Sequence, residues 1–213
     1  MKSKEHFNKA KEYFKSEDWN NASKENDIAL KLDSSNFEVS ILKSKIKQKM
    51  NANEEAVQIL KSLLNKNYKT DTINFLIANN YFSIGSYYTF QKSNDKKRQT
   101  AYNNALTYFD KAIKINSQYL KAFENKSRVL YNLGRFEEAI ITLNNAILIF
   151  PKRMSLISAR GVVKDKLGDK AGAISDLNKA INSTMLDSID IGTACRFRGI
   201  IYSNIDSPAG PTK

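Results

Sequence analysis

Residues 120–151 read LKAFENKSRVLYNLGRFEEAIITLNNAILIFP, and this stretch decides the fold. Apolar and small residues recur in it at intervals of three and four, as they do on one face of a helix. Gly134 divides the stretch into two such runs, and Pro151 ends the second, because proline cannot continue a helix. The stretch therefore predicts two helices joined by a tight turn at the glycine.

The same pattern returns along the chain at a fixed interval. Two sets of alanines recur every 34 residues: Ala105, Ala139 and Ala173, and then Ala112, Ala146 and Ala180. A period of this size marks a repeat array. In such an array each pair of helices is too small to bury its own apolar stripe, so neighbouring pairs stack and share one core.

The register also resembles a known family. With Leu120 as position 1, positions 4, 8, 15, 17, 20, 24, 27 and 32 are Phe123, Ser127, Gly134, Phe136, Ala139, Leu143, Ala146 and Pro151. This arrangement resembles the tetratricopeptide repeat, a helix-turn-helix unit of 34 residues. The resemblance implies an all-α fold, a right-handed α-solenoid of stacked helix-turn-helix repeats, with about five repeats and a C-terminal helix.

Applied to the whole chain, the register predicts a single solenoid over residues 1–206 and a flexible tail at 207–213. The expected repeats are 3–36, 37–70, 71–119, 120–153 and 154–187, followed by a lone helix at 188–203. The third repeat carries a 15-residue insertion near 82–100. We expect both of its helices to be longer by about two turns and to meet at a polar tip near Asn94.

The insertion brings an aromatic cluster, Tyr87, Tyr88 and Phe90. One interpretation is that these rings pack across the long hairpin, against Ala101, Tyr102 and Leu106. Another is that the arm stands free of its neighbours and exposes the rings as a contact for a partner, since aromatic residues dominate interface hot spots. A third interpretation is that the insertion is a disordered loop.

The resemblance also implies a function and a site. In this family, first-helix side chains of successive repeats line a concave groove that receives peptides or partner helices. The expected groove residues are Phe75, Asn79 and Phe82, then Lys121, Asn125, Arg128 and Asn132, and then Ser158 and Val162. Asparagine can bond a peptide backbone, and cations attract acidic groups. We therefore expect a non-enzymatic scaffold or adaptor that binds a peptide or helical segment of a partner protein, aided by the third hairpin.

One well-known version of the family binds chaperone C-termini through a carboxylate clamp. Counted from the third repeat, this chain has Phe75, Ser155 and Ala159 where that clamp needs three cations. Binding of chaperones by this route is therefore not expected.

Two further functions remain as alternatives, one suggested by the net charge and one by the C-terminal helix. The net charge is +12, and the excess of cations is spread evenly over both halves of the chain. An even spread is typical of a solvated surface or of a protein with an acidic partner, and it does not favour a nucleic-acid-binding solenoid. The other alternative is a regulatory subunit that docks, or forms an oligomer, through the lone C-terminal helix, which is apolar around much of its circumference.

Catalytic chemistry finds little support in the sequence. The chain has one histidine, His6, and one cysteine, Cys195, so we expect no catalytic residues, no metal site and no cofactor. No apolar run approaches 18 residues, so no membrane span is expected. The charged start does not look like a signal peptide, and a lone cysteine suits a reducing compartment. A cytoplasmic location follows as the prediction, although an export signal removed earlier would not be seen.

Overall fold

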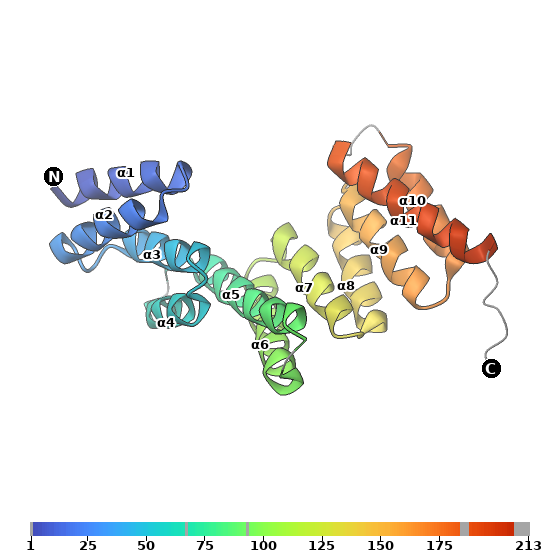
Figure 1. The fold of residues 1–213 in the computed structure, drawn as a ribbon, viewed down its shortest axis with the longest axis horizontal. Helices are drawn as coiled ribbons and strands as arrows, with labels where there is room; N and C mark the ends of the chain where they lie inside the picture. The colour runs from blue at the N-terminus through green and yellow to red at the C-terminus, as the bar shows by residue number, and fades with distance from the viewer. Residues whose placement is uncertain (1, 67, 93, 184–187, 207–213) are drawn as a thin grey trace. The chain divides into compact units, whose positions relative to one another are not determined.

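The computed structural model describes residues 2–66, 68–92, 94–183 and 188–206, and within these ranges it contains eleven α-helices and no strand (Figure 1). The helices are α1 (Lys2–Lys15), α2 (Trp19–Leu32), α3 (Phe37–Lys49), α4 (Asn53–Leu64), α5 (Thr70–Phe90), α6 (Asp95–Ile115), α7 (Leu120–Asn132), α8 (Phe136–Ile149), α9 (Met154–Lys166), α10 (Lys170–Ile181) and α11 (Ser188–Asp206). The expected tail at 207–213 lies outside the described residues. None of the described helices combines the length and the hydrophobicity that a membrane-spanning segment needs.

Consecutive helices pair into hairpins, and the hairpins form two compact units. The N-terminal unit, residues 1–117, holds α1 to α6, and the C-terminal unit, residues 118–213, holds α7 to α11. Each expected repeat contains one hairpin, and α11 follows the last of them. The all-α fold of helix-turn-helix repeats is thereby confirmed. That the two units continue as one array over residues 1–206 stays a prediction.

Small side chains stand where helices approach most closely. The alanine at position 20, or its equivalent after the insertion of the third hairpin, is fully buried in all five hairpins: Ala22, Ala56, Ala105, Ala139 and Ala173. Position 8 is Ala10, Ser44, Ala78, Ser127 and Gly161, all buried. At Gly161 even a methyl group would lie 3.0 Å from the carbonyl oxygen of Ala173. Larger residues at these positions would separate the helices, because protein interiors leave little free volume.

A left-handed residue reverses the chain in the four ordinary hairpins. Position 15 of each has positive φ: Glu17 at 62°, Asn51 at 61°, Gly134 at 73° and Gly168 at 83°. This conformation ends a helix sharply, and glycine adopts it at the lowest cost. Only two of the four positions are glycine, so the turn geometry is shared even where its usual residue is absent.

The third hairpin departs from this rule. Both α5 and α6 have 21 residues, against 12 to 14 in the helices of the other hairpins. Its position 15 is Gly85, which lies inside α5 rather than in a turn. A Cβ on Gly85 would lie 2.5 Å from two ring carbons of Tyr102, whose side chain is completely buried. The glycine thus makes room for an aromatic ring between two long helices.

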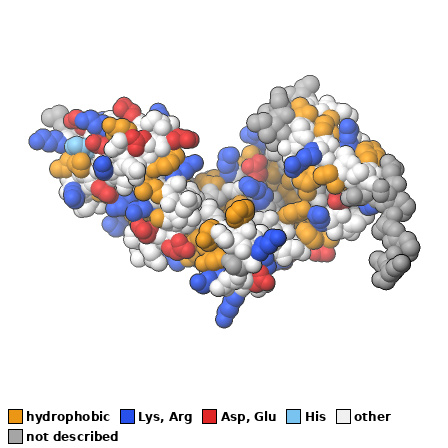
Figure 2. All heavy atoms as spheres, viewed as in Figure 1, with side chains coloured by type: hydrophobic (Ala, Val, Ile, Leu, Met, Phe, Trp, Pro, Cys, Tyr) orange, Lys and Arg blue, Asp and Glu red, His pale blue; other side chains and the backbone are white. Residues whose placement is uncertain are grey.

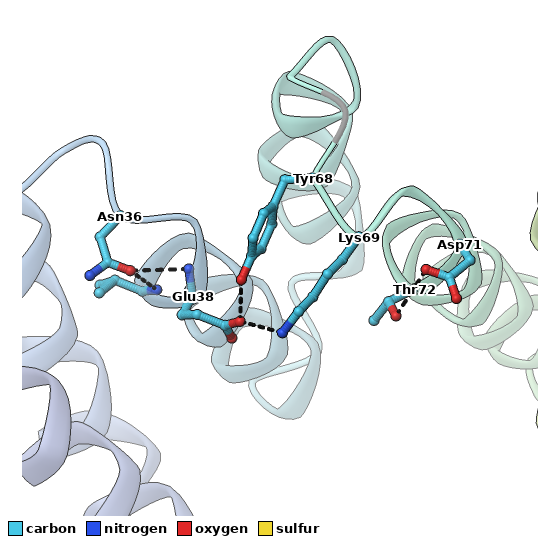
Figure 3. A network of polar contacts seen from close by, with 7 residues as sticks. Asn36, Glu38, Tyr68, Lys69, Asp71 and Thr72 are labelled. Atoms are coloured by element: carbon cyan, nitrogen blue, oxygen red, sulfur yellow. Dashed lines mark hydrogen bonds and ion pairs between the residues drawn. The ribbon is translucent and has the colours of Figure 1, made fainter.

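A polar network joins the second hairpin to the start of α5 (Figure 3). The carboxylate of Glu38, at the start of α3, accepts hydrogen bonds from Lys69 Nζ and the Tyr68 hydroxyl, both at 2.5 Å. These two bonds lower the pKa of Glu38. Beside them the rings of Phe37 and Tyr68 lie 4.8 Å apart. The segment before α5 is therefore fixed on the preceding hairpin.

Candidate functional site

A groove of about 530 Å³ opens in the C-terminal unit. Three first helices of successive repeats, α7, α9 and α11, contribute most of its lining, and α8 adds one residue. The lining residues are Ser127, Arg128, Tyr131, Asn132, Leu143, Ser155, Ser158, Ala159, Val162, Val163, Thr193 and Phe197. The repeat register explains this membership, because residues at equivalent positions of stacked helices point to the same side.

The floor of the groove is apolar and belongs to the core. Val162 and Phe197 pack against a buried cluster formed by Ala173, Leu177 and Ala194. A side chain that entered the groove would therefore meet a surface already held in place from behind. Such a preformed apolar floor is typical of ligand sites.

The rim of the groove is mostly neutral and polar. Arg128 and Asn132 of α7 are exposed there, one helical turn apart. On α9, the hydroxyl of Ser155 donates to a carboxylate oxygen of Glu124 on α7 at 3.2 Å. Arg128 is the one cation among the lining residues, and none of them is acidic. The rim can thus hydrogen-bond a peptide backbone and attract a single carboxylate.

The structure brings together four of the nine residues expected in the groove: Arg128, Asn132, Ser158 and Val162. Two others, Lys121 and Asn125, lie on α7 outside the lining, the first exposed and the second half-buried. The remaining three, Phe75, Asn79 and Phe82, lie on α5 in the N-terminal unit.

Of these α5 residues, Phe75 is buried, with its ring 6.0 Å from that of Phe109 on α6. Phe82 is half-buried, and its ring lies 6.0 Å from that of Tyr102. Both rings therefore contribute to packing within the third hairpin. A role for these residues in a partner site stays a prediction.

Sequence reasoning missed the contribution of α11. Thr193 and Phe197 close one side of the groove, while Ala194 and Ile201 of the same helix are buried against its neighbours. The register contained the signal for Thr193, because residue 188 continues the 34-residue count and places Thr193 at position 6, as Ala159 is in α9. Docking of a partner or a second copy through this helix stays a prediction.

The three aromatic residues of the long hairpin have different surroundings. Tyr88 is half-buried, with Lys97 Nζ 5.8 Å from its ring centroid, and Tyr87 meets it edge to face at 5.5 Å. Tyr87 is 58% exposed and Phe90 is 85% exposed. Tyr102 is the ring that fills the interior of the hairpin. The cluster is therefore exposed at its outer end, and a role in binding stays a prediction.

Groups able to support metal or acid–base chemistry are sparse. Within the described ranges no set of three or more His, Cys, Asp and Glu side chains could hold a metal ion. His6 Nδ1 lies 2.7 Å from a carboxylate oxygen of Glu25, a pair that joins α1 to α2. Cys195 is half-buried on α11.

Comparison with known proteins agrees with the repeat register. Residues 120–153 match the family model described as the tetratricopeptide repeat. No curated protein sequence matches the chain. The resemblance to this family is confirmed both by that match and by solved structures of tetratricopeptide-repeat proteins.

Three of those structures illustrate the likeness. MamA superposes with a TM-score of 0.67 at 15% identity, over 100% of this chain and 98% of that one. TTC0263, a thermophilic repeat protein of Thermus thermophilus, gives 0.66 at 15% identity, over 96% and 100%. YrrB, described as having an unusual peptide-binding site, gives 0.62 at 18% identity, over 90% of each chain. At these identities the likeness establishes the fold alone.

Proposed function

We propose that this protein is a non-enzymatic interaction scaffold. The proposal builds on the tetratricopeptide repeat that the chain carries and on its all-helical fold. The protein binds a peptide or helical segment of a partner protein in the groove of the C-terminal unit. The observation that supports this proposal is the groove itself. Its volume is typical of a ligand site, and it has an apolar floor below a rim that can form hydrogen bonds. The cytoplasm stays the predicted location.

The chemistry of the rim and floor defines what the partner segment would carry. One apolar side chain of the segment rests on Val162 and Phe197, which the core supports from behind. The amide of Asn132 meets the segment's backbone through one donor and one acceptor. Arg128 pairs with a carboxylate near the apolar residue. A segment of this kind buries its anchor and keeps the rest of its length on the polar rim.

Peptide selection tests the proposal directly. A displayed library of random 12-residue peptides is panned on the intact protein and counter-selected on the double variant Arg128→Ala/Asn132→Ala. We expect enriched peptides with a large apolar residue next to Asp or Glu. Synthetic copies of them should bind the double variant at least tenfold more weakly, as measured by fluorescence anisotropy.

A matched variant separates the groove from the surface in general. Asn145→Ala/Lys179→Ala removes one exposed amide and one exposed cation from the same unit, outside the groove lining. It should leave the affinity unchanged, and circular dichroism should show equal helix content in all three proteins. If no peptide discriminates between the wild type and Arg128→Ala/Asn132→Ala, the groove is not the binding site.

A further inference from the structure

A second hollow, of about 570 Å³, lies in the N-terminal unit on the third hairpin. Its floor is one face of α5, its wall is the first part of α6, and Glu54 at the start of α4 stands at its rim. The lining residues are Glu54, Tyr81, Ile84, Tyr88, Asn94, Lys96, Lys97, Thr100, Ala101 and Asn104. We call this surface the lysine–tyrosine groove.

The floor follows from helical spacing. Tyr81, Ile84 and Tyr88 are three and seven residues apart, so they lie in one row along α5. The row spans roughly 10 Å, two turns of helix. That length matches two turns of a bound helix or three residues of an extended strand.

Cations dominate the polar part of the groove. Lys96 and Lys97 are both exposed on its wall, and Glu54 is the one acidic residue of the lining. A third cation, Lys61 of α4, adjoins the floor, with its ammonium donating to the Tyr81 hydroxyl at 3.0 Å. Figure 2 shows Lys and Arg side chains at the end of the third hairpin, along the lower edge of the view.

The position of two of these cations has a cost for the helix that carries them. Lys96 and Lys97 lie in the first turn of α6, where the partial positive charge of the helix terminus disfavours cations. Asn94 satisfies the backbone N–H of Lys97 at 3.0 Å, and Asp95 supplies one acid in that turn. Two adjacent lysines thus lie at a helix end that favours acidic residues. A bound carboxylate would offset both the repulsion between their ammonium groups and their unfavourable interaction with the helix terminus.

From this arrangement we propose that the lysine–tyrosine groove binds an acidic segment of a partner protein. An apolar side chain of the segment lies over Ile84 between the two tyrosine rings, and its carboxylates meet Lys96 and Lys97. This site is distinct from the groove of the C-terminal unit, because it shares none of its lining residues.

The tyrosine rings argue for a protein segment over single-stranded nucleic acid. The ring of Tyr81 already stacks on that of Tyr108, 5.9 Å away and tilted by only 24°. Tyr88 has the edge contact with Tyr87 and the ammonium of Lys97 near its ring. Bases bind such surfaces by stacking on open ring faces, and both of these rings already have a protein group near them.

The test uses a displayed library of random 12-residue peptides on the full chain, counter-selected with Lys96→Glu/Lys97→Glu. Acids are favoured in the first turn of a helix, so this variant should keep its fold. We expect enriched peptides rich in Asp and Glu around an apolar residue. Synthetic copies should bind the variant at least tenfold more weakly than they bind the wild type. Binding that is equal, or enriched peptides that are not acidic, would overturn the proposal.

Two more variants make the result specific. Lys24→Glu/Lys31→Glu reverses two exposed cations of α2 in the same unit and should weaken binding by less than twofold. Asn104→Trp keeps the charge but fills the groove, so it should weaken binding at least tenfold. A 20-nucleotide single strand of thymidine that binds the wild type more tightly than the peptides do would assign the surface to nucleic acid and refute the proposal.

Discussion

Arg160 and Asp176 form a two-point ion pair between α9 and α10. Arg160 Nε donates to Asp176 Oδ2 and Nη2 donates to Oδ1, both at 2.8 Å. Lys164 Nζ adds a contact to the same carboxylate at 2.9 Å, and Arg160 Nη1 donates to Asn144 on α8 at 2.9 Å. One guanidinium therefore links three helices of the C-terminal unit around a carboxylate that is 7% exposed.

Replacing this arginine should destabilise the C-terminal unit. Arg160→Ala leaves the buried carboxylate with Lys164 as its remaining cation, so we expect a loss of about 2–4 kcal/mol in the free energy of unfolding. Urea unfolding followed by circular dichroism measures the loss. Arg153→Ala, an exposed arginine of the same unit, is the control and should change stability by about 0.5 kcal/mol or less. Equal effects of the two substitutions would mean that the ion pair does not hold the helices together.

The same carboxylate should make stability depend on pH. Burial raises the pKa of Asp176, but hydrogen bonds from Arg160 and Lys164 outweigh burial and lower it below its usual value. The stabilisation is therefore present above the unfolded-state pKa, about 4, and is lost as the pH falls through the lower folded value. We expect the advantage of the wild type over Asp176→Asn to be constant from pH 7 to 5 and to shrink towards pH 3. Urea unfolding at these pH values measures it, and an advantage that grows at low pH would contradict the assignment.

Gly85→Ala should loosen the long hairpin even though alanine favours helices. The added methyl group would press on the buried ring of Tyr102, and overpacking of this kind costs about 1–3 kcal/mol. Hydrogen exchange along α5 and α6 should become faster. Gly192→Ala is the control, because nothing lies within 4 Å of its Cβ position on α11, and there alanine should stabilise the helix by up to about 1 kcal/mol. Unchanged exchange in Gly85→Ala would show that the ring moves aside at no cost.

Two substitutions at position 15 should have opposite effects. Glu17 holds a positive φ that strains a non-glycine residue, so Glu17→Gly should stabilise the first hairpin by about 0.5–1 kcal/mol. Gly168→Ala introduces that strain without any steric contact and should cost about 1 kcal/mol. Trp19 fluorescence follows the first hairpin, and hydrogen exchange of α9 and α10 follows the other. Effects of the same sign would show that backbone conformation does not decide stability at this position.

Much of the fold could be predicted from repeat positions that accept only a few residue types. Ala139 and Ala173 indicated the 34-residue repeat, and both are fully buried. Gly134 predicted a turn, and it has the expected positive φ. At Glu17 the turn was harder to foresee, because the fold imposes a conformation that the residue does not favour.

The candidate site was less predictable than the fold. The repeat register predicts the direction in which a side chain points, but it does not predict which residues that side chain contacts. Phe75 and Ser158 share position 5, yet Ser158 lines a groove, while the larger ring of Phe75 packs on Phe109. Phe197 lines the groove because α11 packs on α9 and α10, and the sequence pattern does not indicate this packing. Side-chain size and the identity of the next helix decide such cases, and neither can be derived from periodicity.

The left-handed turn gives the four hairpins that contain it a common backbone plan. Gly134 and Gly168 both reverse the chain with a positive φ, of 73° and 83°, so the α7–α8 and α9–α10 hairpins turn in the same way. A second copy of residues 120–153, spliced after Arg153, should extend the C-terminal unit by one hairpin without redesign. Helix content by circular dichroism should rise in proportion to the added residues, and the length of the protein then becomes a quantity that can be chosen.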